Sequence, residues 1–415
     1  MSHRKEEMYP WIIVALYSCL GFTMPAAVTQ YSMVVGEVAQ ALSVPQQTVL
    51  LSDTVRAVCL VCSMFFSSWF YRHIGLRKTM ALGLTFQILP QFLVPMAIGL
   101  KSLPLLFVLK GLQGCNAITF PLYISTIVMW VGDRYKGAAT AIFNGSFVAG
   151  AGIGSWLSGI IIPALGWQSS FYLVGGLCLV FAVPVIMLTR DKTEAEAAPP
   201  RRPERKTDWQ VVRSPSTWLL IFSLAANTWV VQAVTVDLPV YSSYLGYGYA
   251  QTGNMMMAVS IVTVAASALA GIVSDRRAAA GGNPLRSRCS VQSMGYVICI
   301  AAALCLPFLA EKGVWFLALA ACAMMFGASW AGGVFWALPS EVYSEGKVVE
   351  GTAFCSSASN VPNPAAPMVI GVLLGSNGLW TAGWLTCAAV SVVSLAVTLA
   401  IPGSSPGRQK PVVTE

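Results

Sequence analysis

Residues 169–188 read SSFYLVGGLCLVFAVPVIML, a stretch without a charged side chain. Because a helix rises about 1.5 Å per residue, about 20 apolar residues cross the hydrocarbon core of a bilayer with their backbone N–H groups bonded inside the segment. The stretch therefore predicts a transmembrane helix. About twelve such runs fill most of the chain, beginning near Trp11, Thr48, Thr79, Pro104, Gly137, Ser169, Ser216, Ala250, Cys289, Val314, Gly351 and Leu379.

The composition agrees with a membrane protein, because 56% of the residues are hydrophobic and only 10% are charged. A soluble domain carries roughly 25% charged residues. We therefore predict an all-α integral membrane protein with twelve transmembrane helices. Ten of the eleven cysteines fall inside the apolar runs, and Cys59-x-x-Cys62 has no histidine nearby. Hence no disulfide framework, metal site or cofactor is expected.

The basic residues predict the orientation, because Lys and Arg are retained on the cytoplasmic side of short loops. With the N-terminus inside, Lys101 and Lys312 are the only basic loop residues on the outer side. Both termini are then cytoplasmic, and the net charge of +8 reflects topology rather than nucleic-acid binding. The compact loops favour a multi-pass protein of a prokaryotic cytoplasmic membrane, and we expect a monomer.

A long hydrophilic stretch divides the chain into two halves. Residues 190–215 contain several prolines and charges of both signs, which is typical of a solvated linker. We predict one six-helix bundle over residues 1–189, a second over residues 216–402, and a cytoplasmic tail over residues 403–415. Two such halves are typical of transporters that alternate access around a site at the membrane midplane.

Corresponding loops of the two halves carry similar motifs. The motif residues are Gly75, Arg77 and Lys78 after the second run, and Gly271, Asp275 and Arg276 after the eighth. They resemble the loop signature of the major facilitator superfamily, Gly-x-x-x-Asp-Arg-x-Gly-Arg-Arg. The resemblance implies twelve helices in two pseudo-symmetric halves and a loop that latches the cytoplasmic side. In the first half Arg72 stands where the family has the acid.

Two further segments resemble anion porters of that superfamily. The opening Tyr9-Pro10-Trp11 with Tyr31-Ser32 is similar to the oxalate/formate and monocarboxylate group, and the loop 72–78 without its acid is similar to the cyanate-permease-like group. These resemblances imply a small anionic substrate. Since spans eight and eleven carry no Lys or Arg, the positive charge for an anion would come from spans two and four.

Four ionisable side chains lie inside the apolar runs: Asp53 and Arg56 on span two, Lys110 on span four and Asp237 on span seven. Ionisable groups at that depth are costly and typically mark a functional site. Three roles remain open. Arg56 and Lys110 bind an anion, Asp237 pairs with one of them to close the outer mouth, or Asp53 and Arg56 neutralise each other. Asp53 and Asp237 are also the candidates for proton coupling.

Polar side chains at helical spacing extend this site. Ser63 and Ser67 continue the face of Asp53 and Arg56, which we expect to line the central cavity. Amide and aromatic side chains on the other spans are candidates to grip and enclose the substrate. The predicted substrate-binding residues are Arg56, Lys110, Gln113, Asn116, Gln30, Tyr31, Asn144, Gln232, Asn360 and Trp330.

We therefore predict a secondary active transporter of a small organic anion, monocarboxylate-like and proton-coupled, working by rocker-switch alternating access. The alternative is a proton-driven exporter of drugs or metabolites, although span five has glycines without the proline that such exporters usually carry. A receptor built on the same fold is a further class. An enzyme is not expected, because the loops are too short for a catalytic domain.

Overall fold

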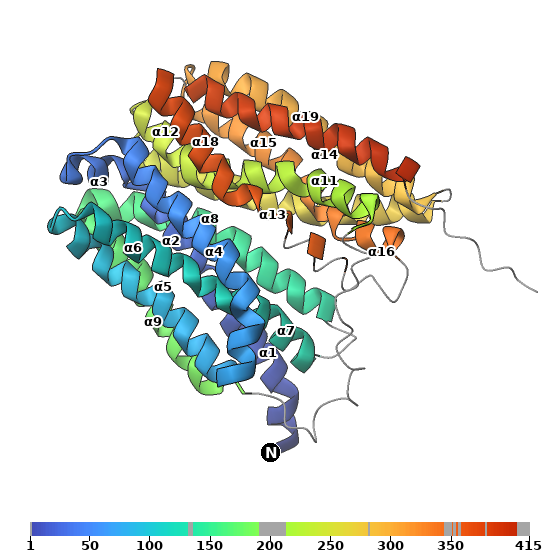
Figure 1. Ribbon diagram of the computed structural model, residues 1–415, viewed down its shortest axis with the longest axis horizontal. Helices are drawn as coiled ribbons and strands as arrows, with labels where there is room; N and C mark the ends of the chain where they lie inside the picture. Colours follow the sequence, from blue (N-terminus) through green and yellow to red (C-terminus); the bar gives the residue numbers. More distant parts are fainter. Residues whose placement is uncertain are drawn as a thin grey trace, which may run out of the picture.

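The computed structural model describes residues 2–131, 136–190, 213–280, 283–343, 351, 354–355, 358–377 and 380–404, and this part of the chain is helical throughout (Figure 1). The N-terminal half comprises α1 (Ser2–Gly21), α2 (Thr23–Met33), α3 (Val35–Leu42), α4 (Gln46–Ile74), α5 (Leu76–Gly99), α6 (Leu103–Gly114), η1 (Cys115–Thr119), α7 (Phe120–Val131), α8 (Lys136–Leu165) and α9 (Trp167–Leu188). The C-terminal half comprises α11 (Pro215–Gln232), η2 (Ala233–Asp237), α12 (Leu238–Tyr244), α13 (Tyr249–Ala279), α14 (Pro284–Ala310), α15 (Val314–Phe335), α16 (Leu338–Val342), α18 (Pro362–Asn377) and α19 (Trp380–Ser404).

Within the described residues, eleven helical segments are long and apolar enough to cross a membrane, against the twelve expected. The remaining predicted span, which begins near Gly351, corresponds to α18. That helix has 16 residues, and part of the sequence before it lies outside the described residues. The predicted starts of the other spans agree with the helices to within a few residues, so the all-helical membrane fold is confirmed.

Two of the spans change their helical pitch near the middle. Span four runs from α6 through the 3-10 segment η1 into α7, and span seven runs from α11 through the π-helical segment η2 into α12. Such local departures from α-geometry alter the direction of side chains and are frequent at functional sites. Asn116 lies in η1 and Asp237 in η2, so both segments carry a residue that the sequence had singled out.

The two halves form adjacent bundles (Figure 1) that differ in packing from one end to the other. At the end opposite the termini, a single hydrophobic core includes Val34 and Val38 of the first half and Val234 and Met256 of the second. At the end where α1 begins and α19 ends, the clusters of the described residues are separate for each half. Among the described residues, the halves therefore share a core at the end opposite the termini and have separate clusters at the other end.

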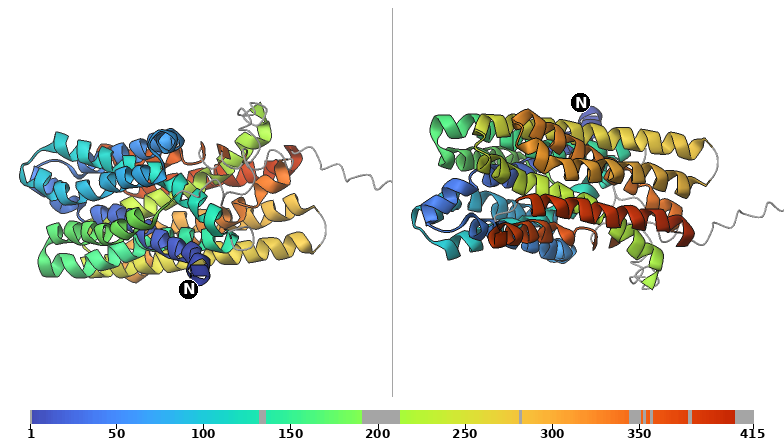
Figure 2. Two further views of the ribbon diagram at one scale, coloured as in Figure 1. Left: turned by 90° about the horizontal axis from the view of Figure 1, so that it is seen from below. Right: turned by 90° about the horizontal axis from the view of Figure 1, so that it is seen from above.

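Helices α8 and α13 run side by side along the boundary between the halves (Figure 2). A Cβ on Gly152 would lie 2.7 Å from the Cβ of Ser260 and 3.0 Å from the Cα of Met257. Glycine thus permits the two backbones to approach closely, as small residues do between membrane helices.

Candidate functional site

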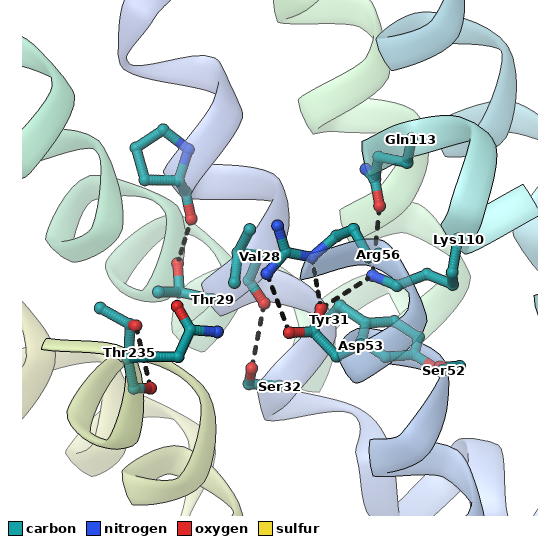
Figure 3. Close-up of polar contacts among 12 residues, drawn as sticks. Val28, Thr29, Tyr31, Ser32, Ser52, Asp53, Arg56, Lys110, Gln113 and Thr235 are labelled. Atoms are coloured by element: carbon teal, nitrogen blue, oxygen red, sulfur yellow. Dashed lines mark hydrogen bonds and ion pairs between the residues drawn. The ribbon is translucent and has the colours of Figure 1, made fainter. Parts of the chain in front are cut away.

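The charged cluster is built on one face of α4. Arg56 Nε donates to Asp53 Oδ1 at 2.5 Å, and Arg56 Nη2 donates to Asp53 Oδ2 at 2.9 Å. The spacing of three residues places both side chains on the same face of the helix. The result is a two-pronged ion pair within one helix (Figure 3), in which two of the three guanidinium nitrogens are occupied.

Lys110 reaches the same carboxylate from α6. Its ammonium lies 3.5 Å from Asp53 Oδ1 and 3.7 Å from the centroid of the Tyr31 ring, and it donates to Gln113 Oε1 at 3.1 Å. The Tyr31 hydroxyl is itself hydrogen-bonded to the Ser52 hydroxyl at 2.8 Å. Lys110 is therefore enclosed by an acid, an amide oxygen and an aromatic ring.

The cluster holds two basic groups and one acid almost entirely out of contact with solvent. The exposed fraction is 0% for Asp53, 5% for Arg56 and 1% for Lys110. Arg56 Nη1 has no hydrogen-bond partner in the described part of the chain, whereas Lys110 is enclosed on several sides. Arg56 Nη1 is thus the donor of the cluster that remains available for a ligand.

Asp237 approaches from the other half on η2. It is fully buried, and neither carboxylate oxygen has a hydrogen-bond partner among the described residues. The described ion pairs join Arg56 and Lys110 to Asp53 rather than to Asp237. In this conformation the acid of the second half is a buried carboxyl without a cation beside it.

Of the predicted uncharged residues, Tyr31 and Gln113 contact Lys110, whereas Gln30 bonds α9. Gln30 Nε2 donates to Ser170 at 2.8 Å, and its Oε1 has no partner in the described chain; the same holds for Nε2 of Gln232. In Figure 3, Thr235 of η2 lies across from Thr29 and Ser32 of α2. The halves therefore meet through small polar side chains beside the cluster.

The remaining predicted residues are more dispersed. Trp330 donates its indole N–H to the Val291 carbonyl at 2.9 Å and stacks on Phe326, so its polar group is used within the second half. Asn144 is exposed on α8, and Asn360 is half-buried just before α18. The structure does not bring these three into contact with the charged cluster.

Two serines on α4 differ from the expectation. Ser67 donates to the Ile118 carbonyl at 2.6 Å, and Ser63 donates to the Leu60 carbonyl at 2.9 Å and lies 3.4 Å from that of Gly114. This part of the helix face packs against span four instead of lining a central cavity. The two serines do share a helix face, as predicted. That face meets span four and not a cavity, because α4 and span four approach closely at Gly114.

Gly114 sets the distance between the helices that carry Arg56 and Lys110. A Cβ there would lie 2.1 Å from the Arg56 carbonyl oxygen and 2.9 Å from the Cβ of Cys59. We expect Gly114→Ala to lower the free energy of unfolding by about 1–3 kcal/mol, because overpacking forces the backbones apart. Thermal unfolding in detergent measures this. Gly145→Ala is the matched control, since a Cβ there meets nothing within 4 Å. Equal unfolding temperatures for the two variants would contradict the prediction.

The second-half loop motif forms an ion-pair network. Arg288 of α14 bonds Asp275 at 2.8 Å and Ser274 at 3.1 Å, and it lies 3.4 Å from Glu341 of α16. Asp275 was predicted from the motif; Arg288 and Glu341 were not singled out. In the first half, Gly75 has a φ of +79° and joins α4 to α5. Gly271 is half-buried, whereas Arg77, Lys78 and Arg276 are exposed.

Sequence reasoning missed Gln87 and Gln91 on α5. Gln91 Oε1 accepts from Gln113 Nε2 at 3.4 Å, and Gln87 Oε1 accepts from Asn116 Nδ2. A signal was present, because the two glutamines stand one helical turn apart in an otherwise apolar run. They connect span three to the residues around Lys110.

A multi-pass membrane protein of two helical bundles, with a buried charged cluster on α4 and α6 of the first, has the architecture typical of secondary transporters. The model of the Major Facilitator Superfamily matches residues 11–347, and the chain belongs to that superfamily. The predicted superfamily is thus confirmed.

The chain is similar in sequence to proteins named as transporters of anions. It is 22% identical over 241 residues to the chloroplastic sodium-dependent phosphate transport protein 1 of Arabidopsis thaliana, covering 54% of this chain and 47% of the relative. It is also 22% identical to the chloroplastic ascorbate transporter of the same plant, covering 54% and 44%. The chain therefore spans less than half the length of these curated relatives. Among solved structures, the D-xylose-proton symporter superposes with a TM-score of 0.74 at 13% identity, covering 96% of this chain and 98% of the other, which supports the fold alone.

Proposed function

We propose that this protein is a secondary active transporter of a small organic anion, monocarboxylate-like, coupled to protons and working by rocker-switch alternating access. The observation that carries the proposal is the cluster of Arg56, Lys110 and Asp53. It sets two basic groups against one acid at a buried position.

The charge balance favours a monoanion. With all three groups ionised, the cluster has one net positive charge, and uncompensated charge is costly away from water. A single carboxylate on Arg56 Nη1 would neutralise it. The planar fork of arginine suits a carboxylate better than the point charge of lysine does. We therefore assign anion binding to Arg56 and a supporting role to Lys110.

The relatives support the anionic class without naming this substrate. These relatives are named for phosphate and ascorbate, which are both anions. A site with a single net charge and an enclosed lysine fits a small monocarboxylate better than an ion with several charges. The site therefore favours small monocarboxylates as the substrate class.

Proton coupling is proposed for Asp237. A carboxylate without a hydrogen-bond partner in the described chain is costly to bury as an anion unless it binds a proton or pairs with a cation. Arg56 and Lys110 belong to the other half, and both already contact Asp53. Movement of the halves that brings Asp237 to Arg56 would release a proton and close the site, so coupling and gating share these residues.

Alternating access is supported by the distribution of the cores. The halves share one core at the end opposite the termini and have separate clusters at the other end. With the termini in the cytoplasm, this arrangement would correspond to a closed outer side. Rocking of the bundles would separate the halves at this end and bring them into contact at the end where the termini lie.

The test is thermal stabilisation of the detergent-purified protein by acetate, pyruvate, lactate, phosphate and lipophilic cations. We expect stabilisation by at least one monocarboxylate, which Arg56→Gln and Lys110→Gln abolish. Lys312→Gln is the matched control, because it removes one positive charge from an exposed position outside the spans. Stabilisation by lipophilic cations alone, unchanged in both variants, would overturn the proposal and favour a drug exporter.

A further inference from the structure

Gln87 and Gln91 form two buried amide links between α5 and span four. Their exposed fractions are 1% and 2%, and they lie one helical turn apart on the same face. Gln91 accepts from Gln113 at 3.4 Å, and Gln87 accepts from Asn116. The two links have the same chemistry and nearly the same burial. They differ in the next contact, because Gln113, the partner of Gln91, also accepts a hydrogen bond from Lys110.

The orientation of the Gln91 link is dictated by Lys110. An ammonium donates hydrogen bonds but cannot accept one, so Gln113 must turn its Oε1 towards Lys110. Its Nε2 then faces Gln91, which must present its own oxygen as the acceptor. Gln91 Nε2 is left without a hydrogen-bond partner among the described residues. Gln87 Nε2 is likewise without a partner in the described chain, so the contact of Gln113 with Lys110, and not the orphaned nitrogen, distinguishes the two links.

The distances around Asp53 indicate what the link achieves. Arg56 Nε and Lys110 both approach Asp53 Oδ1, at 2.5 Å and 3.5 Å. Gln113 holds the ammonium at 3.1 Å, closer than the acid does. Without that amide oxygen, the ammonium would keep Asp53 and the Tyr31 ring as its contacts among the described residues. Gln113 therefore contributes the shortest of the described contacts that hold the ammonium in place.

We infer that Gln91 is a positioning residue, which acts through Gln113 to hold the Lys110 ammonium beside Asp53. It touches neither Lys110 nor the proposed anion position. Its effect is to fix the position of the Gln113 side chain, because the Gln91 oxygen accepts from the amide nitrogen on the side away from the ammonium. The use of this arrangement in anion transport rests on the proposed function, whereas the effect on Lys110 does not.

The experiment compares the rate at which Lys110 is methylated by formaldehyde and cyanoborohydride in the detergent-purified full chain. Peptide mass spectrometry reads the modification, and the exposed Lys101 provides the internal reference. The amine must be free of its hydrogen bonds to react. Because a hydrogen bond from a charged donor contributes about a factor of ten, we expect methylation of Lys110 to be about tenfold faster in Gln91→Met.

Three further variants separate positioning from helix packing. Gln113→Met should match Gln91→Met, and the double variant should react no faster than either, because Gln91 acts through Gln113. Gln87→Met, the matched control, should react as the wild type does, although it breaks the same kind of link. Gln91→Asn, whose amide is one methylene shorter, repeats the test with a polar side chain if the methionine variant folds poorly.

Equal rates in Gln87→Met and Gln91→Met would overturn the inference, as would a wild-type rate in Gln91→Met or a further increase in the double variant. The labelling requires no substrate. If no monocarboxylate stabilises the wild type but the labelling pattern is as expected, the proposed function fails and the positioning of Lys110 by Gln91 stands.

Discussion

Arg56→Gln is expected to abolish monocarboxylate uptake into proteoliposomes, lowering the rate by about a hundredfold or more, the range seen when one partner of a buried charge pair is removed. The substitution removes the one cation with a spare donor, Nη1. It also leaves Asp53 with Lys110 at 3.5 Å as its remaining cation among the described residues. Breaking such a pair costs about 3–5 kcal/mol, so the unfolding temperature should fall as well.

Two controls separate loss of charge from loss of geometry. Arg56→Lys keeps the positive charge but cannot hold Asp53 by two nitrogens while offering a third, so we expect folding with weak uptake. Lys312→Gln should leave both uptake and stability unchanged. Uptake by Arg56→Gln at more than a tenth of the wild-type rate would show that the anion does not depend on this side chain.

Asp237→Asn is expected to eliminate accumulation driven by a pH gradient while preserving exchange of labelled for unlabelled substrate. The amide has nearly the same shape as the carboxyl but cannot take up or release a proton at this site. Because neither oxygen of Asp237 has a hydrogen-bond partner in the described chain, the substitution breaks no described bond. The unfolding temperature should therefore not fall.

Asp53→Asn provides the contrasting variant. Asp53 is as buried as Asp237, but it accepts from Arg56 and lies beside Lys110. Neutralising it leaves two cations without their acid, so we expect a clear loss of stability, of about 3–5 kcal/mol. Wild-type accumulation by Asp237→Asn under a pH gradient would remove this residue from the coupling mechanism.

Much of the fold could be predicted because a bilayer imposes the same requirement on every span. The run expected from Val314 begins α15 at that residue, and the runs from Pro104 and Ala250 begin within one residue of α6 and α13. The change of pitch at η1 and η2 was not predicted, since segments 115–119 and 233–237 lie inside continuous apolar runs that are long enough to be read as single helices. Their geometry depends on the neighbouring helices.

The site was predictable in its charged members and in Tyr31 and Gln113, which contact Lys110. Asp53, Arg56 and Lys110 were evident because charge is rare in apolar runs, and the structure brings these three together. Gln91 went unnoticed although Gln87 stands one turn before it, because a pair of amides does not show which side chains it contacts. Its importance depends on a chain of contacts through Gln113 that joins residues 22 positions apart.

By itself, the sequence determined that this is a helical membrane protein of two halves with a few buried charges. Each span requires a run of about 20 apolar residues, so the spans and the charges within them can be recognised from hydropathy alone. Which cation pairs with which acid was decided only by tertiary structure. Arg56 and Lys110 are 54 positions apart in the sequence, and both approach the Asp53 carboxylate because α4 and span four meet at Gly114. An ion pair depends on distances of a few ångströms, and only the packed helices set those distances.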